Sequence, residues 1–203
     1  MTDLFTPLPF SHGPAMKNRF MLAPMTNQQS HPDGRLSDDE RRWLVMCAAG
    51  GFGLTMTCAS HVQAVGQGFP GQLGIFSDDH VEGLTGLAAA IKAEGSLAVV
   101  QLHHAGARSP AALIGGQPVC PSDDPESGAR ALTGEEVERL IADFIAAATR
   151  ARRCGFDGVE IHGAHGYVLA QFLSPTLNRR RDAYGGSADN RARIVLEILN
   201  GVR

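Results

Sequence analysis

Four short apolar runs recur along the chain, and longer amphipathic segments separate them. The runs cover residues 19–24 (RFMLAP), 53–57 (GLTMT), 97–102 (LAVVQL) and 158–161 (GVEI). None of them alternates cleanly between apolar and polar residues. Continuous apolar runs of this length are typical of strands that are buried on both faces, as in a parallel sheet.

The segments between these runs predict helices, and most of their starts carry capping residues. SDDE at 37–40 and TGEE at 133–136 match the capping box, in which a hydroxyl covers a free backbone N–H and the glutamate reaches back. Ser77 is expected to cap a helix between the second and third runs. The helix after TGEE is the clearest, because its apolar positions follow a 3.6-residue period up to Gly155. A last helix is expected from near Ser187.

The alternation of strand and helix predicts an α/β fold with parallel strands joined by right-handed crossovers. Both an open doubly wound sheet and a β/α barrel fit this order. Four β/α units are too few to close an eight-stranded barrel, which typically takes about 250 residues. The one long irregular stretch, 106–132, is expected to be functional or an insertion. No linker interrupts the chain, so 1–203 is expected to form a single domain.

Composition and charge exclude several classes of protein. The 203 residues are 43% hydrophobic and 19% charged, as in globular proteins. The net charge of −3, with no basic stripe, argues against nucleic-acid binding. No apolar run approaches the roughly 20 residues that span a bilayer, and the N-terminus does not read as a signal peptide. Four separated cysteines without CxxC spacing indicate reduced thiols, mostly in the core, and a cytoplasmic location.

Two motifs invite functional readings that the surrounding sequence does not support. GQGFPG at 66–71 matches GxGxxG, but Pro70 interrupts it and the next helix starts only after Ser77, so it is not expected to bind a dinucleotide. Histidine pairs at 103–104 and 162/165 would suit a metal-dependent hydrolase. That reading is less favoured, because Zn²⁺ needs three or four convergent ligands and no HExxH is present. The other histidines are expected to be structural or exposed: His12, His31, His61 and His80.

Chemically useful side chains follow every predicted strand. Ligands of β/α folds bind at the carboxyl ends of strands, so these side chains are expected to share one site. His162 and His165 can donate together to one oxygen, which would polarise a carbonyl group. A tyrosine hydroxyl is a proton donor at neutral pH, which suggests that role for Tyr167. The other strand ends supply small or hydrogen-bonding side chains that suit a flat, neutral ligand: Thr26, Ala59 and Gln101.

The same segments resemble the Old Yellow Enzyme family of flavin-dependent ene-reductases. The resemblance covers essentially the whole chain and rests on MKNRFMLAPMTN (16–27), QLHHAG (101–106) and the long run GFDGVEIHGAHGYVLAQFLSPTLNRRRDAYGGSADNRARIVLE (155–197). It implies an FMN enzyme on an eight-stranded (β/α)8 TIM barrel. NADH or NADPH would reduce the flavin, which would pass hydride to the β-carbon of an activated alkene such as an enone.

The resemblance also implies a role for each site residue. His162 and His165 would bind the carbonyl oxygen of the substrate, and Tyr167 would protonate the α-carbon. The flavin would lie against five residues, with Thr26 near its O4/N5 edge, Ala59 at the ring edge and Gln101 at the pyrimidine end: Pro24, Met25, Thr26, Ala59 and Gln101.

This sequence departs from the family's pattern in two ways. Cys58 stands where many relatives carry glutamate. Relatives are also longer, so the chain is expected to cover only the first four β/α units, a half-barrel that lacks the phosphate site such barrels build after strands seven and eight. The alternative is therefore a catalytically inactive fragment or an assembly module. A half-barrel leaves two strand edges open, so self-association is expected.

Overall fold

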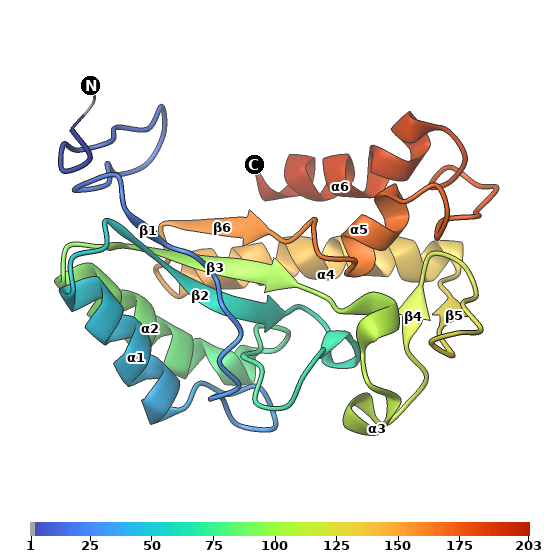
Figure 1. The fold of residues 1–203 in the computed structure, drawn as a ribbon, viewed down its shortest axis with the longest axis horizontal. Helices are drawn as coiled ribbons and strands as arrows, with labels where there is room; N and C mark the ends of the chain where they lie inside the picture. Colours follow the sequence, from blue (N-terminus) through green and yellow to red (C-terminus); the bar gives the residue numbers. More distant parts are fainter. Residues whose placement is uncertain (1–2) are drawn as a thin grey trace.

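The structure is a computed structural model that describes residues 3–203. Its main sheet has four parallel strands in the order β1-β2-β3-β6 (Figure 1). They are β1 (Met21–Leu22), β2 (Leu54–His61), β3 (Leu97–His103) and β6 (Gly158–Ile161). The predicted parallel sheet is confirmed. The predicted bounds of two strands are wrong, because β1 is shorter than 19–24 and β2 continues beyond residue 57.

Strand β2 runs through residues that the sequence analysis placed at its end. Its pairing with β3 shifts register between Met56 and Ala59. The polar residues there are satisfied locally, since the hydroxyls of Thr57 and Ser60 both donate to the carbonyl oxygen of Cys58. A strand can therefore continue across a polar stretch that reads like a loop.

Helices cover one face of this sheet. The helices α1 (Asp38–Ala49), α2 (Val81–Ala93) and α4 (Gly134–Arg153) lie along that face, and α6 (Ala188–Val202) packs against α4 (Figure 1). The core between helices and sheet is apolar, with Leu44, Leu84 and Phe144 fully buried. This arrangement leaves the other face of the sheet free to carry a site.

Only one of the two predicted capping boxes forms completely. At α4 both halves form, with Glu136 N–H donating to Thr133 Oγ1 at 3.2 Å and Thr133 N–H donating to Glu136 Oε2 at 2.9 Å. At α1 the hydroxyl of Ser37 accepts from Glu40 N–H, but the prediction that the Glu40 side chain reaches back is wrong. Glu40 is fully buried and its carboxylate accepts from Cys58 Sγ at 2.5 Å and from the hydroxyl of Ser30.

The face of the sheet away from the helices is only partly covered. A small apolar cluster of Met16, Leu54, Met56 and Val99 lies there, and Leu8 packs against it. Leu8 and Met16 pair in an antiparallel bridge, so the N-terminal segment folds over this end of the sheet. Within residues 3–203, no strand pairs with the outer edge of β1 or of β6, as expected for a half-barrel.

Short elements fill the remaining connections. The 106–132 stretch contains η3 (Gly106–Arg108), α3 (Ala111–Ile114), β4 (Val119–Cys120) and β5 (Arg130–Ala131). Helix α5 (Val168–Leu173) was not predicted from the sequence. Two further 3₁₀ turns, η1 (Ala64–Gly66) and η2 (Asp78–His80), flank the GxGxxG segment. No helix follows that segment directly, as the sequence predicted.

All four cysteines are free thiols, and three of them are buried, as predicted. In the part of the chain that the structure describes, no helix has the length and apolar character needed to cross a membrane.

Candidate functional site

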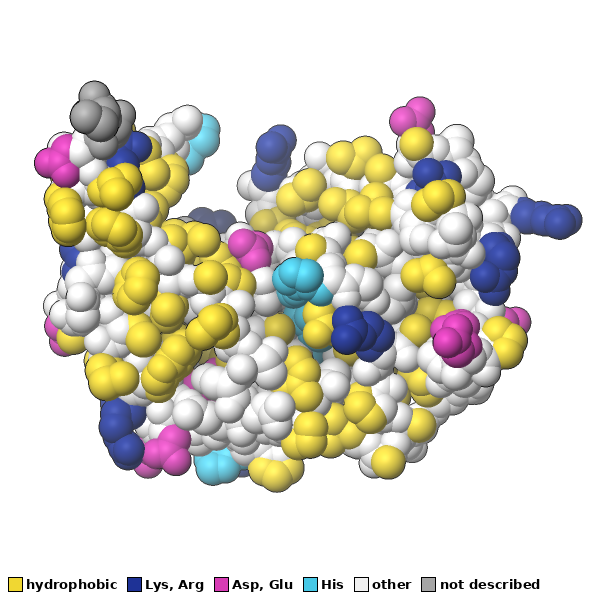
Figure 2. Space-filling view, in the orientation of Figure 1, with side chains coloured by type: hydrophobic (Ala, Val, Ile, Leu, Met, Phe, Trp, Pro, Cys, Tyr) yellow, Lys and Arg dark blue, Asp and Glu magenta, His cyan; other side chains and the backbone are white. Residues whose placement is uncertain are grey.

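Seven of the eight predicted site residues line a single cavity of about 220 Å³ on the helix-free face of the sheet: Pro24, Thr26, Ala59, Gln101, His162, His165 and Tyr167. The exception is Met25, whose side chain is 56% exposed and does not line this cavity. Figure 2 shows this face of the molecule, with histidine side chains beside a basic one near its centre.

Parallel pairing of the strands brings the floor of the cavity together. Ala59 of β2 lies opposite Gln101 of β3, and Gln101 lies opposite Glu160 of β6. His162 follows directly after β6, two residues beyond Glu160, so the two side chains leave the chain on the same side. Residues far apart in sequence therefore meet because their strands end at one edge of the sheet.

Glu160 fixes the orientation of the Gln101 side chain. The amide Nε2 of Gln101 donates to Glu160 Oε1 at 2.6 Å. Gln101 consequently offers its carbonyl oxygen, an acceptor, to whatever occupies the cavity. Glu160 is not among the residues predicted from the sequence, although a lone charge in an apolar strand, two residues before His162, was a usable signal.

His162 is held in one neutral form. Burial, followed by the neighbouring His165, lowers the pKa of His162 below its ordinary value. Ala164 N–H donates to His162 Nδ1 at 3.2 Å, so the proton of the neutral ring lies on Nε2. That Nε2 lies 3.3 Å from His165 Nδ1 and donates to it.

The two histidines therefore bind each other here, whereas the sequence analysis expected both to donate to one oxygen. His165 accepts at Nδ1, so its own proton lies on Nε2. Its backbone adopts φ +56°, in the left-handed region that favours glycine. A ligand oxygen that receives both donors has to replace this contact between the rings, of which His165 is the exposed one.

Tyr167 is positioned by packing and by its place at the start of α5. Its ring meets His103 edge-to-face at 4.3 Å between centroids, and His162 at 5.1 Å. The next residue, Val168, donates its N–H to the carbonyl oxygen of His104 at 3.1 Å. No hydrogen bond involves the Tyr167 hydroxyl within residues 3–203, so it is free to donate to a ligand.

His103 and His104 are buried neutral groups behind the cavity. The Gln72 amide lies 3.0 Å from His103 Nδ1 and donates to it, and burial lowers the pKa of His103 to about 2. His104 Nε2 donates to Gln63 Oε1 at 3.1 Å, and burial lowers its pKa to about 3. Over the described residues, no three or more His, Cys, Asp or Glu side chains are grouped to hold a metal ion.

Gln171 ties the two loops that carry the site together, and the sequence analysis missed it. Its buried amide donates to Gly166 O at 2.7 Å and accepts from Ala107 N–H at 3.1 Å. Gly106 adopts φ +64°, and a Cβ there would collide with the Gln171 side chain. The last residue of QLHHAG is therefore a glycine for a steric reason.

Comparisons with known proteins place this geometry in a family. The chain is 43% identical, over 98% of its length, to a probable NADH-dependent flavin oxidoreductase of Bacillus subtilis (strain 168). It superposes on an Old Yellow Enzyme homologue from Zymomonas mobilis with a TM-score of 0.92 and 33% identity, covering 99% of this chain. A 2-naphthoyl-CoA reductase in complex with 2-naphthoyl-CoA gives a TM-score of 0.93 at 35% identity over 98% of this chain.

The chain spans only part of each of these proteins: 55% of the Bacillus protein, 59% of the Zymomonas protein and 33% of the naphthoyl-CoA reductase. A parallel four-stranded sheet that covers little more than half of a TIM-barrel homologue is consistent with the predicted half-barrel. The family model of the NADH:flavin oxidoreductases and NADH oxidases matches residues 3–203. The names of this family and of the Bacillus protein agree with the predicted flavin cofactor and nicotinamide reductant. The chain belongs to the NADH:flavin oxidoreductase / NADH oxidase family, to which its resemblance to the Old Yellow Enzymes pointed.

Proposed function

We propose that the protein containing this chain is an NAD(P)H-dependent ene-reductase that saturates the C=C bond of an enone-like substrate in the cytoplasm. The overall change adds two electrons and two protons: NAD(P)H, a proton and the alkene give NAD(P)⁺ and the saturated product. The observation that carries the proposal is the single cavity that joins Gln101, Ala59 and Thr26 on one side to His162, His165 and Tyr167 on the other.

The cavity residues fit the ring of FMN. The lining holds no Lys, Arg, Asp or Glu, only small, apolar, hydroxyl, amide, phenol and imidazole groups, as a neutral flat ring requires. Gln101 presents a carbonyl oxygen, which suits the N–H of the pyrimidine ring. Ala59 is small enough to allow close approach. When bound, FMN supplies two-electron chemistry, taking hydride from NAD(P)H and giving it to the alkene carbon.

The residues on the other wall of the cavity are proposed to bind the substrate and supply the proton. His162 and His165 are proposed to hold the substrate's carbonyl oxygen and to stabilise the negative charge that develops on it. Because the pKa of His162 is lowered, this ring donates as a neutral group and keeps its proton. Tyr167, whose hydroxyl has no other partner in residues 3–203, is proposed to deliver the proton to the α-carbon.

The open edges of β1 and β6 support a second proposal, that the chain by itself self-associates. The cavity lining also lacks a basic residue for the phosphate of FMN. Both observations favour the alternative that this chain alone is an assembly module whose catalytic competence depends on further strands.

Replacing Tyr167 with phenylalanine tests the ene-reductase proposal. In the FMN-loaded protein, Tyr167→Phe is expected to slow alkene reduction by roughly 10²–10⁴-fold and to spare flavin reduction by NAD(P)H, because only alkene reduction needs a proton at carbon. Stopped-flow absorbance follows the two half-reactions separately. Tyr184→Phe is the matched control, since the only other tyrosine donates to Glu197 outside the cavity. Equal slowing of both half-reactions would show that Tyr167 is only structural.

A further inference from the structure

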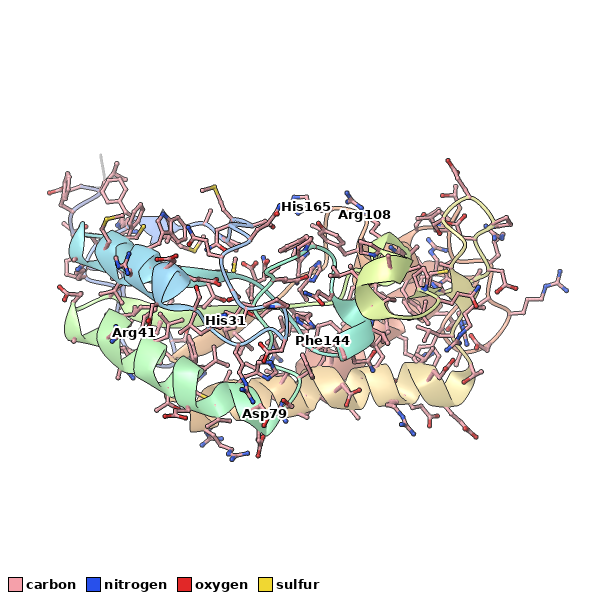
Figure 3. All side chains as sticks on the ribbon, turned by 90° about the horizontal axis from the view of Figure 1, so that it is seen from below. His31, Arg41, Asp79, Arg108, Phe144 and His165 are labelled. Atoms are coloured by element: carbon pink, nitrogen blue, oxygen red, sulfur yellow. The ribbon has the colours of Figure 1, made fainter. Side chains whose placement is uncertain are left out.

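Arg108 places a positive charge directly beside the proposed reaction centre. It closes the 3₁₀ turn η3 that follows β3. Its guanidinium carbon lies 4.9 Å from the centre of the Tyr167 ring, and its Nη1 donates to the backbone oxygen of His165 at 2.6 Å. Figure 3 shows Arg108 and His165 side by side, on the side of the molecule away from α2 and α4.

This charge has no counter-ion in residues 3–203. Two nearby arginines are paired with carboxylates: Arg130 binds Glu136 at 2.7 Å and Arg180 binds Asp182 at 2.5 Å. Arg108 is exposed and forms no ion pair, and only one of its nitrogens has a hydrogen-bond partner within the described chain. The guanidinium therefore keeps free donors at the rim of the site.

We infer that Arg108 recognises an anionic group on the substrate, and that the preferred alkene carries a carboxylate on its C=C bond. This inference rests on the proposed function. A guanidinium matches a carboxylate geometrically, because its fork of donors can bind both oxygens. Hydride addition to an unsaturated carboxylate builds further negative charge on an anionic group. A fixed cation beside His165 offsets that charge where it develops.

The position of Arg108 favours the alkene over the reductant as the source of the anion. Arg108 contacts the residues that would hold and protonate the reacting carbons, so its partner is attached close to those carbons. In NAD(P)H a ribose separates the nicotinamide ring from the nearest phosphate. A carboxylate conjugated to the alkene lies nearer to the reacting carbons than that phosphate does.

A neighbouring cavity suits the hydrocarbon tail of such an acid. This cavity of about 250 Å³ opens on Arg108 and Gly166, and apolar residues such as Pro121 and Leu177 line part of it. Asp124 and Arg179 also line it, so its polar part carries charges of both signs. The structure therefore favours an unsaturated acid with an apolar tail.

A matched pair of ligands separates charge recognition from a merely structural role. Trans-2-hexenoate and trans-2-hexenamide have nearly the same shape and differ in charge. Their dissociation constants can be measured without turnover, from the absorbance change of the oxidised FMN-loaded protein. The acid is expected to bind on the order of tenfold more tightly than the amide, and this preference should shrink as ionic strength rises.

Substitutions then assign the preference to one residue. Arg108→Gln is expected to lower the acid-to-amide preference about tenfold. Arg108→Lys should retain part of it, because the charge remains but the fork is lost. The control, Arg181→Gln, removes the same charge from an exposed position in a different surface cavity and should leave the preference unchanged. If Arg108→Gln does not fold, the lysine variant and the salt dependence of the unmodified protein decide.

Each alternative outcome is distinguishable. Equal loss of acid and amide binding in Arg108→Gln would show that the guanidinium only holds the His165 loop, and would overturn the inference. A loss confined to NAD(P)H binding would assign it to the reductant's phosphates and would also overturn it. If 2-cyclohexenone binds but the acid binds no more tightly than the amide, only this inference is overturned. Failure of all three ligands to bind would overturn the proposed function as well.

Discussion

Lowering the pH from 7 to 5 is expected to destabilise the protein, because three histidines stay neutral in the folded state. Burial lowers the pKa of His103 to about 2, of His104 to about 3 and of His61 to about 4. In the unfolded chain an imidazole titrates near 6.5. Below pH 6.5 the unfolded state therefore binds more protons than the folded state. The histidine contribution to stability is complete above that pH and is lost as the pH falls.

The size of the effect follows from the same pKa values. Integrated from pH 7 to pH 5, each histidine lowers the free energy of unfolding by about 2 kcal/mol, so the three together lower it by roughly 5–6 kcal/mol. That loss is comparable to the whole stability of many domains, about 5–15 kcal/mol. Carboxyl groups with lowered pKa values, such as Glu136 at about 2, affect stability mainly below pH 5. The window from pH 5 to 6.5 therefore reports the histidines.

Urea unfolding at a series of pH values measures this slope. Fluorescence of the single tryptophan, Trp43, which packs against the core, follows unfolding. Near pH 5.5 the free energy of unfolding should change by about 3.5–4 kcal/mol per pH unit, and His61→Gln should lower that slope by roughly a third. His31→Gln, at an exposed position, is the control. A slope below about 1.4 kcal/mol per pH unit, the value for one proton, would refute the reasoning.

Three further predictions concern the site, the core and the sheet edges. His162→Ala and His165→Ala should each weaken enone binding to the FMN-loaded protein, and the double variant should lose less than the sum, because both donors are proposed to serve one oxygen; unchanged dissociation constants in both single variants would contradict this. Glu40→Ala should cost roughly 3 kcal/mol in urea unfolding, since it leaves two buried donors unpaired and opens a cavity. The exposed neighbour Asp38→Ala should cost a few tenths of a kcal/mol. The isolated chain should form dimers or larger species, because β1 and β6 have open edges; a monodisperse 21.5 kDa species in light scattering would argue against it.

The arrangement of strands and helices could be predicted because local signals agree with the fold. Apolar runs mark β3 and β6 to within one residue, and the capping box and 3.6-residue period mark α4. Strand β1 is shorter than its apolar run because only Met21 and Leu22 pair with β2. Pairing is a tertiary property, and an apolar run by itself does not show how much of it has a partner.

The membership of the site could also be predicted, but not the contacts inside it. Parallel strands end at one edge, and seven side chains predicted from the strand ends line one cavity. Met25 is exposed, whereas its neighbours Pro24 and Thr26 line the cavity, and the sequence does not show which of three adjacent residues turn inward. The His162–His165 contact depends on the loop conformation, including a positive φ at His165 that the sequence did not signal.

The contacts of Glu40 could not be predicted from its local sequence motif. SDDE and TGEE are equivalent as motifs, yet Glu136 completes its capping box, also paired with Arg130, while Glu40 turns into the core. Its partners are Ser30, ten residues before it, and Cys58, eighteen residues after it, so no short window contains them. Burial, followed by the charge of Glu40, raises the pKa of Cys58, which keeps the thiol protonated as a donor. A glutamate at position 58, as the resemblance describes for many relatives, would place two carboxyl groups together and require one of them to hold a proton. Residues 40 and 58 therefore form one unit, and the identity of either is intelligible only from the folded chain.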